Sequence, residues 1–347
     1  MRLFDSLHAL GHEQVLFCHD PAAGYRAIIA IHSTALGPAV GGTRLWRYAD
    51  EAEALTDALR LARGMTYKNA LAGLPAGGGK SVILRGDGPL GPQDRERLFR
   101  AHGRFIERLA GRYFTGEDVG TAPADMEFVA RETRHVRGLA HGSSDPSPFT
   151  ARGVFRAMQA AALRRWGKAD LAGRVVALQG CGHVGQPLAR LLHEAGARLR
   201  VADVDPERAA DLQRAHGAEV LPPDAILRAD ADVLAPCALG GVLNDQTLPE
   251  IRAAIVVGAA NNQLLEPRHG DALEARGVLY VPDYVANAGG VLSGGVDLFG
   301  WTPAEVARRV DAIHDTVLAV LDGARAEGVS SAVAADRLAE RRLHAAR

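Results

Sequence analysis

The segment GMTYKNALAGLPAGGGKSVI, residues 64–83, places two lysines among residues that are mostly small or apolar. Lysine side chains normally lie at the solvated surface, so Lys68 and Lys80 in these surroundings indicate chemistry or a buried partner. A partly desolvated lysine near a second cation has a lowered pKa and can act as a general base. The letters GGGKS look like the end of a P-loop, but that motif requires a glycine where Leu74 stands, which excludes a nucleoside-triphosphate site.

A second candidate site lies in RVVALQGCGHVGQPLARLLHEAG, residues 174–196, which contains the pattern G-x-G-x-x-G between an expected strand and an expected helix. Here Gly180 permits the tight turn, Gly182 lets the backbone approach a pyrophosphate, and Gly185 allows close packing of helix on strand. The helix N-terminus attracts the phosphates. The alternative is a turn in which the glycines are only structural. The expected cofactor-binding residues of this turn are Gly180, Gly182, His183, Val184 and Gly185.

Asp203 ends the next expected strand, about twenty residues beyond the first glycine, where dinucleotide-binding folds carry an acidic residue. Its carboxylate would accept hydrogen bonds from the ribose 2′-hydroxyl and would repel a 2′-phosphate. Val204 and Asp205 follow, so no arginine stands directly after it. We therefore expect NAD rather than NADP, with an ordinary strand-end residue as the alternative.

These candidate residues require elements that hold them, and the first part of the chain supplies a mixture of strands and helices. Asp50 and Glu53 form a capping-box pattern at the start of a helix that we expect to end at Gly64. A second helix is expected over 94–110. Short runs rich in β-branched or aromatic residues predict strands at 25–31, 81–84 and 112–115.

After the Gly-, Ser- and Pro-rich segment 141–149 the pattern changes to a regular alternation of strand and helix. This alternation predicts a parallel sheet covered on both faces. From Thr302 onward we expect two long helices separated near Gly328, and the sequence leaves open whether they join the first domain. The expected strands are 174–179, 198–203, 232–236, 253–259 and 277–283.

The sequence thus predicts a two-domain α/β fold, with an N-terminal α/β substrate and oligomerisation domain and a C-terminal Rossmann dinucleotide-binding domain. The expected ranges are 1–148 for the substrate-binding and catalytic domain, 149–330 for the NAD-binding domain and 331–347 for a C-terminal helix.

Composition excludes several classes of protein. Of the 347 residues 47% are hydrophobic and the formal net charge is −1, so no basic excess indicates a nucleic-acid or anionic-membrane partner. The three cysteines form no CxxC pair, and the start of the chain does not resemble a signal peptide, so we expect a cytoplasmic protein. No apolar run is long enough to cross a bilayer. None of the thirteen histidines falls in an HExxH pattern, and we expect no metal.

Five longer motifs carry a family resemblance: VGGTRLWRY, GMTYKNALAGLPAGGGK, FTGEDVGTAPADM, GAANNQ and DYVANAGGV. They resemble the amino-acid dehydrogenases of the leucine, phenylalanine and valine group, most closely the leucine dehydrogenases, and the resemblance covers nearly the whole chain. It implies NAD-dependent oxidative deamination of an L-amino acid to a 2-oxo acid and ammonia, carried out by a homo-oligomer.

The resemblance also implies roles for single residues. Lys80 matches the family's catalytic lysine, and Asp118 matches the acid that handles protons at the amino group, with Glu117 as its adjacent competitor. Lys68 matches the lysine that grips the substrate carboxylate, assisted by the backbone at Gly41 and Gly42. Asn262 matches a residue near both substrate and nicotinamide. Further cofactor contacts are implied at Asn261, Thr150, Cys237 and Ala238.

The chemistry agrees with these residue types. Loss of a hydride from Cα leaves an iminium that water attacks. Lys80, with its pKa lowered by burial and by Lys68, would be the base toward that water, and Asp118 would pass a proton to the departing ammonia. We expect the glycines before Lys80 to let substrate and backbone come close. Asp125, Asp145 and Asp283 are assigned instead to caps and turns.

The family's side-chain pocket falls at four positions of this chain, and two glycines there predict a roomy pocket that accepts leucine-like and aromatic side chains. Preferences for phenylalanine or tryptophan are alternatives. A glutamate dehydrogenase is disfavoured because the pocket positions offer no cation. A catalytically silent NAD-binding sensor would have lost Lys80, Asp118 or Gly182. The pocket positions are Val40, Gly116, Val291 and Gly294.

Overall fold

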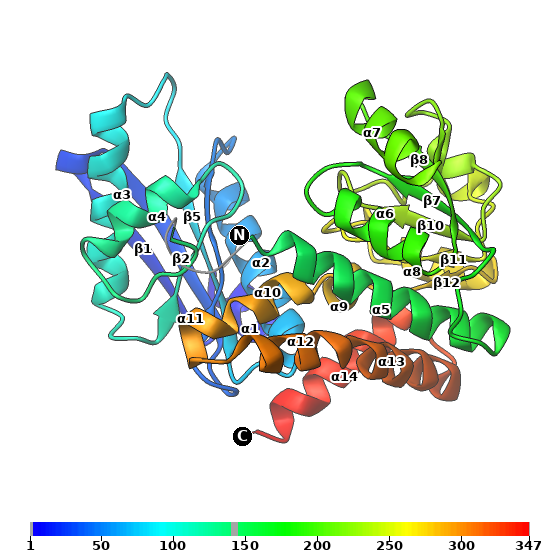
Figure 1. Cartoon of the computed structure of the whole chain (residues 1–347). Coiled ribbons are helices and arrows are strands. Elements are labelled where there is room, and N and C mark those ends of the chain that lie inside the picture. Colours follow the sequence, from blue (N-terminus) through cyan, green and yellow to red (C-terminus); the bar gives the residue numbers. More distant parts are fainter. Residues whose placement is uncertain (1–2, 140–144, 347) are drawn as a thin grey trace. The chain divides into compact units, whose positions relative to one another are not determined.

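The chain divides into two compact units, each built around a six-stranded sheet (Figure 1). The computed structural model describes residues 3–139 and 145–346. Residues 141–144 of the expected linker lie outside the described residues. The predicted α/β fold, with an N-terminal α/β unit and a C-terminal Rossmann-like unit, is confirmed. The first unit contains Met1–Ser144, Gly294–Trp301 and Arg341–Arg347, and the second contains Asp145–Ser293 and Thr302–Glu340.

The sheet of the first unit is mixed, with the strand order β1-β2-β5-β3-β6 and β4 also paired to β5. β2 is antiparallel to β1 and β5, whereas β3 and β4 run parallel to β5. β5 starts four residues before the predicted 81–84 and includes the three glycines. The strands are β1 (Gln14–Asp20), β2 (Tyr25–Ser33), β3 (Ala39–Val40), β4 (Thr43–Trp46), β5 (Gly77–Leu84) and β6 (Tyr113–Phe114).

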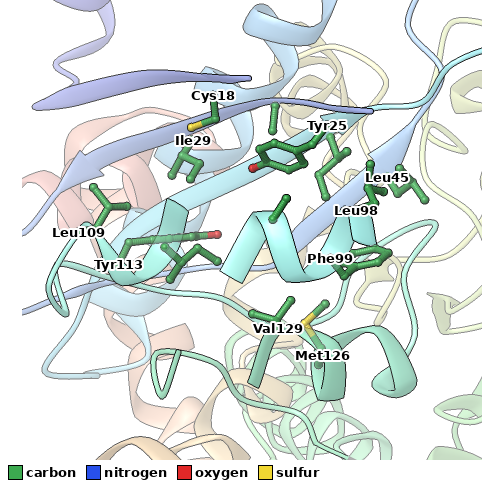
Figure 2. Close-up of a cluster of buried hydrophobic side chains, with 14 of the residues drawn as sticks. Cys18, Tyr25, Ile29, Leu45, Leu98, Phe99, Leu109, Tyr113, Met126 and Val129 are labelled. Atoms are coloured by element: carbon green, nitrogen blue, oxygen red, sulfur yellow. The ribbon is translucent and has the colours of Figure 1, made fainter. Parts of the chain in front are cut away.

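Helices cover both faces of this sheet. Ile29 and Ile31 of β2 point to a core formed with α3 and α4 (Figure 2), and Ile28 and Ala30 point to a second core formed with α2. Successive strand residues point to opposite faces, so two cores alternate along one strand. The helices of this unit are α1 (Leu3–Leu10), α2 (Glu51–Leu71), α3 (Pro92–Glu107), α4 (Pro123–Ala130) and the short α11 (Gly295–Phe299).

Helix α2 begins as predicted but does not end at Gly64. Asp50 caps it by accepting a hydrogen bond from the backbone N–H of Glu53 at 2.8 Å. The prediction of an end at Gly64 was wrong, because the helix runs on to Leu71. A glycine inside a helix costs about 1 kcal/mol, but buried residues after it, among them Tyr67 and Leu71, pack the last two turns onto the unit. Lys68 therefore lies on α2 rather than in a loop.

The sheet of the second unit is parallel, in the order β12-β11-β10-β7-β8-β9. The order reverses between β7 and β10, which is the position where doubly wound folds bind ligands. Two strands are shorter than predicted, although their flanks still exchange backbone hydrogen bonds, such as Val281 N–H to Val256 O. The strands are β7 (Val175–Gln179), β8 (Arg198–Ala202), β9 (Glu219–Val220), β10 (Val233–Pro236), β11 (Ile255–Val256) and β12 (Leu279–Tyr280).

The C-terminal stretch forms three helices, where two were predicted. The break at Gly328 is confirmed, and its left-handed φ of 63° is one that glycine adopts freely. A further break at Ala312 has neither glycine nor proline to mark it. Most of these helices belong to the second unit, and residues from Arg341 belong to the first. The helices from Asp145 on are α5 (Ser147–Trp166), α6 (Gly185–Glu194), α7 (Pro206–His216), α8 (Arg268–Ala275), α9 (Asp283–Ala286), α10 (Gly289–Ser293), α12 (Pro303–Asp311), α13 (Ile313–Glu327) and α14 (Ser331–His344).

Candidate active site

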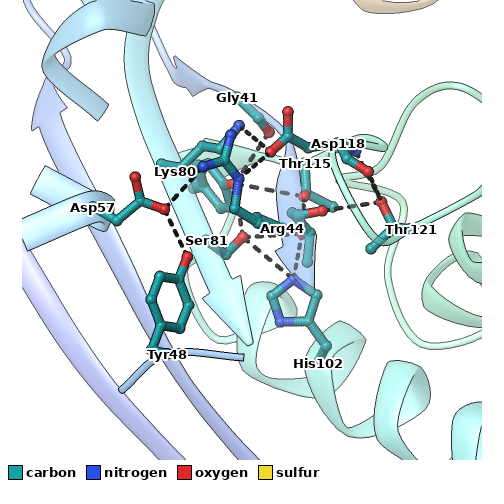
Figure 3. Close-up of polar contacts among 12 residues, drawn as sticks. Gly41, Arg44, Tyr48, Asp57, Lys80, Ser81, His102, Thr115, Asp118 and Thr121 are labelled. Carbon is teal, nitrogen blue, oxygen red and sulfur yellow. Dashed lines mark hydrogen bonds and ion pairs between the residues drawn. The ribbon is translucent and has the colours of Figure 1, made fainter. Parts of the chain in front are cut away.

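Lys80 and Asp118 form an ion pair in the first unit, in which the lysine is buried and the aspartate is partly exposed. The Lys80 Nζ lies 3.0 Å from Asp118 Oδ2, and the lysine is 4% exposed (Figure 3). Burial lowers the pKa of Lys80, while Asp118 acts to raise it. Burial alone would raise the pKa of Asp118, yet Lys80 and Arg44 hold it below its usual value. Asp118, and not the exposed Glu117, is therefore the carboxylate beside this lysine.

Arg44 of β4 joins this pair and was not singled out from the sequence. Its Nε lies 2.9 Å from Asp118 Oδ2, and its Nη1 lies 3.0 Å from Asp57 Oδ2. Asp57 in turn accepts a hydrogen bond of 2.6 Å from the hydroxyl of Tyr48. Arg44 is thus a cation that acts to lower the pKa of Lys80, and the expected contribution of Lys68 stays a prediction. The only signal was the position of Arg44 in the motif VGGTR.

The glycines before Lys80 serve packing. A Cβ on Gly77 would lie 1.8 Å from Ser33 O, and one on Gly78 would lie 2.1 Å from Thr66 N on α2. A Cβ on Gly79 would lie 2.8 Å from the ring of Tyr113. The close backbone approach expected of these glycines is therefore confirmed, because β5 must fit closely against β2, α2 and Tyr113 to carry Lys80 inward. Their role in letting a substrate come close stays a prediction.

Gly41 and Gly42 bring the Asp118 loop against the sheet. A Cβ on Gly41 would lie 1.8 Å from Gly79 O, and one on Gly42 would lie 2.5 Å from Glu117 O and 3.0 Å from the Asp118 Cβ. Any side chain at Gly42 would push Asp118 away from Lys80.

The face of the sheet opposite Lys80 carries a polar cluster that stays neutral. The two ring nitrogens of His102 are hydrogen-bonded, Nδ1 with the hydroxyl of Tyr25 at 2.7 Å and Nε2 with the hydroxyl of Thr43 at 2.7 Å. Ser81 Oγ lies 3.0 Å from Thr43 Oγ1 and 2.9 Å from Tyr113 OH, which also donates to Gly41 O. Burial lowers the pKa of His102 to about 3. We call these five side chains the neutral cluster.

The predicted pocket positions fall in both units. Val40 of β3, Gly116 and Gly294 belong to the first unit, and Val291 of α10 belongs to the second. A Cβ on Gly116 would lie 3.2 Å from Cγ and 3.3 Å from Nε of Arg137, so the arginine already occupies the space that the glycine leaves. Gly116 alone therefore supplies less room than its size indicates.

The glycine turn of the second unit has a different geometry at each glycine. Gly180 has a φ of 97°, and a Cβ there would lie 2.9 Å from Ala238 N. A Cβ on Gly185 would lie 2.0 Å from Gly180 O, so this glycine permits close packing of α6 on β7. At Gly182 the nearest atom would be Arg208 Nη1 at 3.7 Å, which leaves its backbone accessible. His183 and Val184 complete the turn that leads into α6.

Asp203 is tied to this turn. Its Oδ2 accepts a hydrogen bond of 2.7 Å from the N–H of Cys181, and its Oδ1 accepts one of 2.9 Å from the N–H of Asp205. Cys237 follows β10, and its N–H donates to Gln179 O at 2.7 Å. The ends of β7, β8 and β10 thus bring together most of the residues that were predicted to bind the cofactor.

The remaining predicted residues lie elsewhere in the second unit. Asn262 has a left-handed backbone, with φ 53°, and its N–H donates to Asp283 Oδ2 at 2.5 Å. Asp283 is not the N-cap of α9, which is Pro282. Its carboxylate instead fixes the backbone of Asn262. Asn261 Oδ1 accepts a hydrogen bond of 2.8 Å from Asn287. Thr150 lies on α5, where its hydroxyl donates to Pro146 O.

Residues 3–139 and 145–346 contain neither a candidate membrane-spanning helix nor a candidate metal site. No helix there is both long and apolar enough to cross a membrane. No three His, Cys, Asp or Glu side chains are grouped so that they could hold a metal ion.

A parallel sheet with a glycine turn at its switch point, joined to a unit with a buried lysine–carboxylate pair, is typical of two-domain dehydrogenases. Residues 12–135 match the family model "Glu/Leu/Phe/Val dehydrogenase, dimerisation domain", and residues 199–347 match "Glutamate/Leucine/Phenylalanine/Valine dehydrogenase". The chain belongs to this family and is an amino-acid dehydrogenase, an oxidoreductase acting on CH–NH₂ groups.

Relatives with different substrate names are similarly close. Leucine dehydrogenase of Geobacillus stearothermophilus is 49% identical, covering 100% of this chain and 95% of that protein. L-Tryptophan dehydrogenase of Nostoc punctiforme is 48% identical, covering 99% and 96%. The crystal structure of L-tryptophan dehydrogenase from Nostoc punctiforme superposes with a TM-score of 0.90, covering 99% of both chains at 45% identity.

Proposed function

We propose that this protein catalyses the reversible, NAD-dependent oxidative deamination of an apolar L-amino acid to a 2-oxo acid and ammonia. The observation that carries the proposal is the ion pair of buried Lys80 with Asp118, in which Nζ and Oδ2 lie 3.0 Å apart. The reaction requires a base for the attacking water and a group that transfers a proton at the nitrogen. Lys80 can be the first and Asp118 the second. The names of the relatives support an apolar side chain.

The choice of lysine at this position supports a base. Only three of the 40 lysines and arginines in the sequence are lysines, namely Lys68, Lys80 and Lys168. The chain therefore uses arginine almost everywhere that a cation is needed. A guanidinium stays protonated in proteins, whereas a buried ammonium can lose its proton. A lysine kept at the buried position 80 fits a group that must become neutral.

The steps follow from these groups. Lys68 binds the substrate carboxylate, and the carboxylate of Asp118 holds the amino group. NAD, when bound, supplies the acceptor for the hydride that leaves Cα. The Asp118 carboxylate takes a proton from the substrate ammonium group as the iminium forms, and neutral Lys80 accepts a proton from the water that attacks the iminium carbon. Asp118 then returns its proton to the nitrogen of the carbinolamine, and the carbinolamine hydroxyl proton passes to the departing ammonia. Ammonia and the 2-oxo acid leave, and the proton on Lys80 returns to solvent.

The residues of the second unit fit a dinucleotide. The open backbone at Gly182, at the N-terminus of α6, offers N–H groups and a partial positive charge to a pyrophosphate. Asp203 lies beside the turn with an orientation fixed by two backbone N–H groups, and its carboxylate favours a free 2′-hydroxyl. These features support NAD. Asn261, Asn262, Thr150, Cys237 and Ala238 remain proposed cofactor or substrate contacts.

The side chain of the substrate is proposed to be leucine-like, and aromatic amino acids are the alternative. A tryptophan dehydrogenase among the close relatives supports the alternative. Arg137 lies beside Gly116 and takes up space at this predicted pocket position, which supports the smaller substrates.

The protein is also proposed to be a homo-oligomer. The family model that matches residues 12–135 is described as a dimerisation domain. Within that range the side chain of Phe17, on strand β1, is 59% exposed. Size-exclusion chromatography with light scattering tests this, and a monomer at micromolar concentration would contradict it.

The experiment that tests the proposed function is NADH formation by the purified protein with a panel of L-amino acids. Lys80→Ala is expected to abolish turnover. Lys168→Ala is the matched control, because Lys168 is the one lysine outside the proposed site and is exposed. Binding of NAD without turnover of any amino acid would favour the silent sensor instead.

A further inference from the structure

Arg44 lies between two carboxylates that come from different elements (Figure 3). Its Nε contacts Asp118 Oδ2 at 2.9 Å, and its Nη1 contacts Asp57 Oδ2 on α2 at 3.0 Å. The arginine side chain is only 21% exposed. Asp57 is held in turn by the hydroxyl of Tyr48 at 2.6 Å. The guanidinium is therefore fixed at both ends, which a planar fork allows and an ammonium does not.

The two oxygens of Asp118 have different surroundings. Oδ2 accepts from both Lys80 Nζ and Arg44 Nε. Oδ1 has no hydrogen-bond partner among the residues that the structure describes. The carboxylate cannot rotate about its Cβ–Cγ bond without giving up two charge-assisted hydrogen bonds. Oδ1 consequently keeps one orientation and is the oxygen available to a substrate amino group.

The charges around Lys80 come from three elements. Asp118 follows β6, Arg44 is on β4 and Asp57 is on α2. The phenols of Tyr48 and Tyr113 add no charge, because burial raises the pKa of both, that of Tyr113 to about 12. The two carboxylates favour the protonated lysine, and burial and Arg44 oppose them. Arg44 keeps its charge at every working pH.

We propose that Arg44 is a positioning residue for the dehydrogenase reaction: it anchors Asp118 through Oδ2 so that Oδ1 serves the substrate nitrogen, and it counters the pull of two carboxylates on the Lys80 proton. Asp57 and Tyr48 hold Arg44 in this place. The inference rests on the roles proposed above for Lys80 and Asp118. Arg44 acts through Asp118 and Lys80 and does not itself contact the substrate.

A titration of Lys80 tests the electrostatic half of the proposal without any activity. The full-length protein labelled with ¹³C at lysine Cε gives three side-chain signals, which Lys68→Arg and Lys168→Arg assign. Removal of the cation in Arg44→Gln should raise the Lys80 midpoint by about one pH unit. Asp57→Asn removes an anion and should lower the midpoint by about half a unit. General loosening of the site would not give opposite signs.

Kinetics test the positioning half. The rate of oxidative deamination needs neutral Lys80, so the acid limb of kcat/KM should move to higher pH in Arg44→Gln and to lower pH in Asp57→Asn. Arg44→Lys keeps the charge but not the two-ended hold. It should therefore lose kcat by about 10–100-fold, with the acid limb close to that of the wild type. Arg47→Gln is the control, because Arg47 pairs with Asp87 at the surface, where it is 71% exposed.

The outcomes separate this proposal from the proposed function. If no amino acid is oxidised by the wild type, the proposed function is wrong, while the lysine titration still decides whether Arg44 acts on Lys80. If the Lys80 midpoint is the same in the wild type, Arg44→Gln and Asp57→Asn, the proposal is overturned. If Arg44→Gln does not fold, Asp57→Asn and Arg44→Lys carry the same decision, with melting temperatures recorded for each.

Discussion

The two faces of strand β5 form a natural comparison, because neighbouring residues on it belong to opposite kinds of polar network. Lys80 pairs in register with Ala30, on the face that α2 covers, and Ser81 pairs with Ile29, on the face of α3 and α4. Lys80 lies among the charged groups of Asp118, Arg44 and Asp57, and two cations share one carboxylate oxygen of Asp118. Around Ser81 every partner is neutral.

The difference shows how one strand can hold both a reactive site and a rigid support. The neutral cluster exchanges no charge, so its hydrogen bonds keep their pattern across the working pH range. We call Lys80, Asp118, Arg44 and Asp57 the charged network. In it the pKa of Lys80 and the pKa of Asp118 depend on each other. We infer that stability of the first unit resides largely on the Ser81 face and proton chemistry on the Lys80 face.

The largest effect is expected from a substitution of Lys80 on the charged face of β5. Lys80→Arg keeps a cation beside Asp118 but removes the proton acceptor, so kcat for amino-acid oxidation should fall by about 10²–10⁴-fold. The melting temperature should change little, because the ion pair can be kept. Steady-state rates across a range of pH measure this. Recovery of the rate at high pH would contradict the role of Lys80 as a base.

The second effect concerns pH and the neutral cluster. Burial lowers the pKa of His102 from 6.5 to about 3 in the folded protein. Its neutral form therefore contributes stability above pH 6.5, and this stability is lost as the pH falls toward 3. Between pH 6.5 and 5 the loss from this one histidine is about 2 kcal/mol. Chemical unfolding at several pH values should show a flatter dependence in His102→Gln than in the wild type.

The difference in pH dependence between the wild type and His102→Gln reports on His102 and not on another buried histidine. His32, whose pKa burial lowers to about 4, contributes to the same acid loss in both proteins. Parallel curves for the wild type and His102→Gln would show that His102 is not held neutral.

A smaller effect is expected at Ser81, the neighbour of Lys80 on β5. Ser81→Ala leaves Thr43 and Tyr113 each short of one hydroxyl partner, at a cost of about 1–2 kcal/mol in the free energy of unfolding. The rate of the reaction should stay within about threefold of the wild type. Urea unfolding and a rate assay on the same sample measure both. A loss of rate comparable to that of Lys80→Arg would mean that the Ser81 face also takes part in catalysis, against the proposed division between stability and proton chemistry.

The smallest effect is expected at Arg137, whose side chain takes no part in the hydrogen bonds described for either face of β5. Arg137 makes no side-chain hydrogen bond or ion pair within residues 3–139 and 145–346, and its stem lies against Gly116. Arg137→Ala should raise kcat/KM for large side chains relative to leucine by about three- to tenfold. The acid limb of the pH profile should stay in place. A shifted limb with unchanged selectivity would place Arg137 with the charged network instead.

The sequence predicted most of the fold because strands and amphipathic helices leave periodic patterns. It missed the continuation of α2 through Gly64, since tertiary packing of Tyr67 and Leu71 outweighs the local preference of glycine. The break at Ala312 has no glycine or proline to reveal it.

The candidate site was predicted unevenly for a related reason. Lys80 and Asp118 were named from motifs, and the structure brings them together. Arg44, Asp57 and Tyr48 were not, because their contact depends on the pairing of β4 with β5 and the docking of α2. Nothing in a linear pattern distinguishes Asp57 from any other helical carboxylate. The position of Arg137 beside Gly116 could not be predicted from the sequence either, since Arg137 lies 21 positions further along the chain.

The parallel pairing of β4 with β5 sets limits on which insertions the chain can accept. Thr43 stands opposite Ser81, and Arg44 stands opposite Val82. One extra residue within Thr43–Trp46 would turn each following side chain to the other side of the sheet, sending a guanidinium toward His102 and an aliphatic or hydroxyl group toward Asp118. Length variation among natural or engineered homologues should therefore collect in the connection that follows Trp46 and be absent from those four residues.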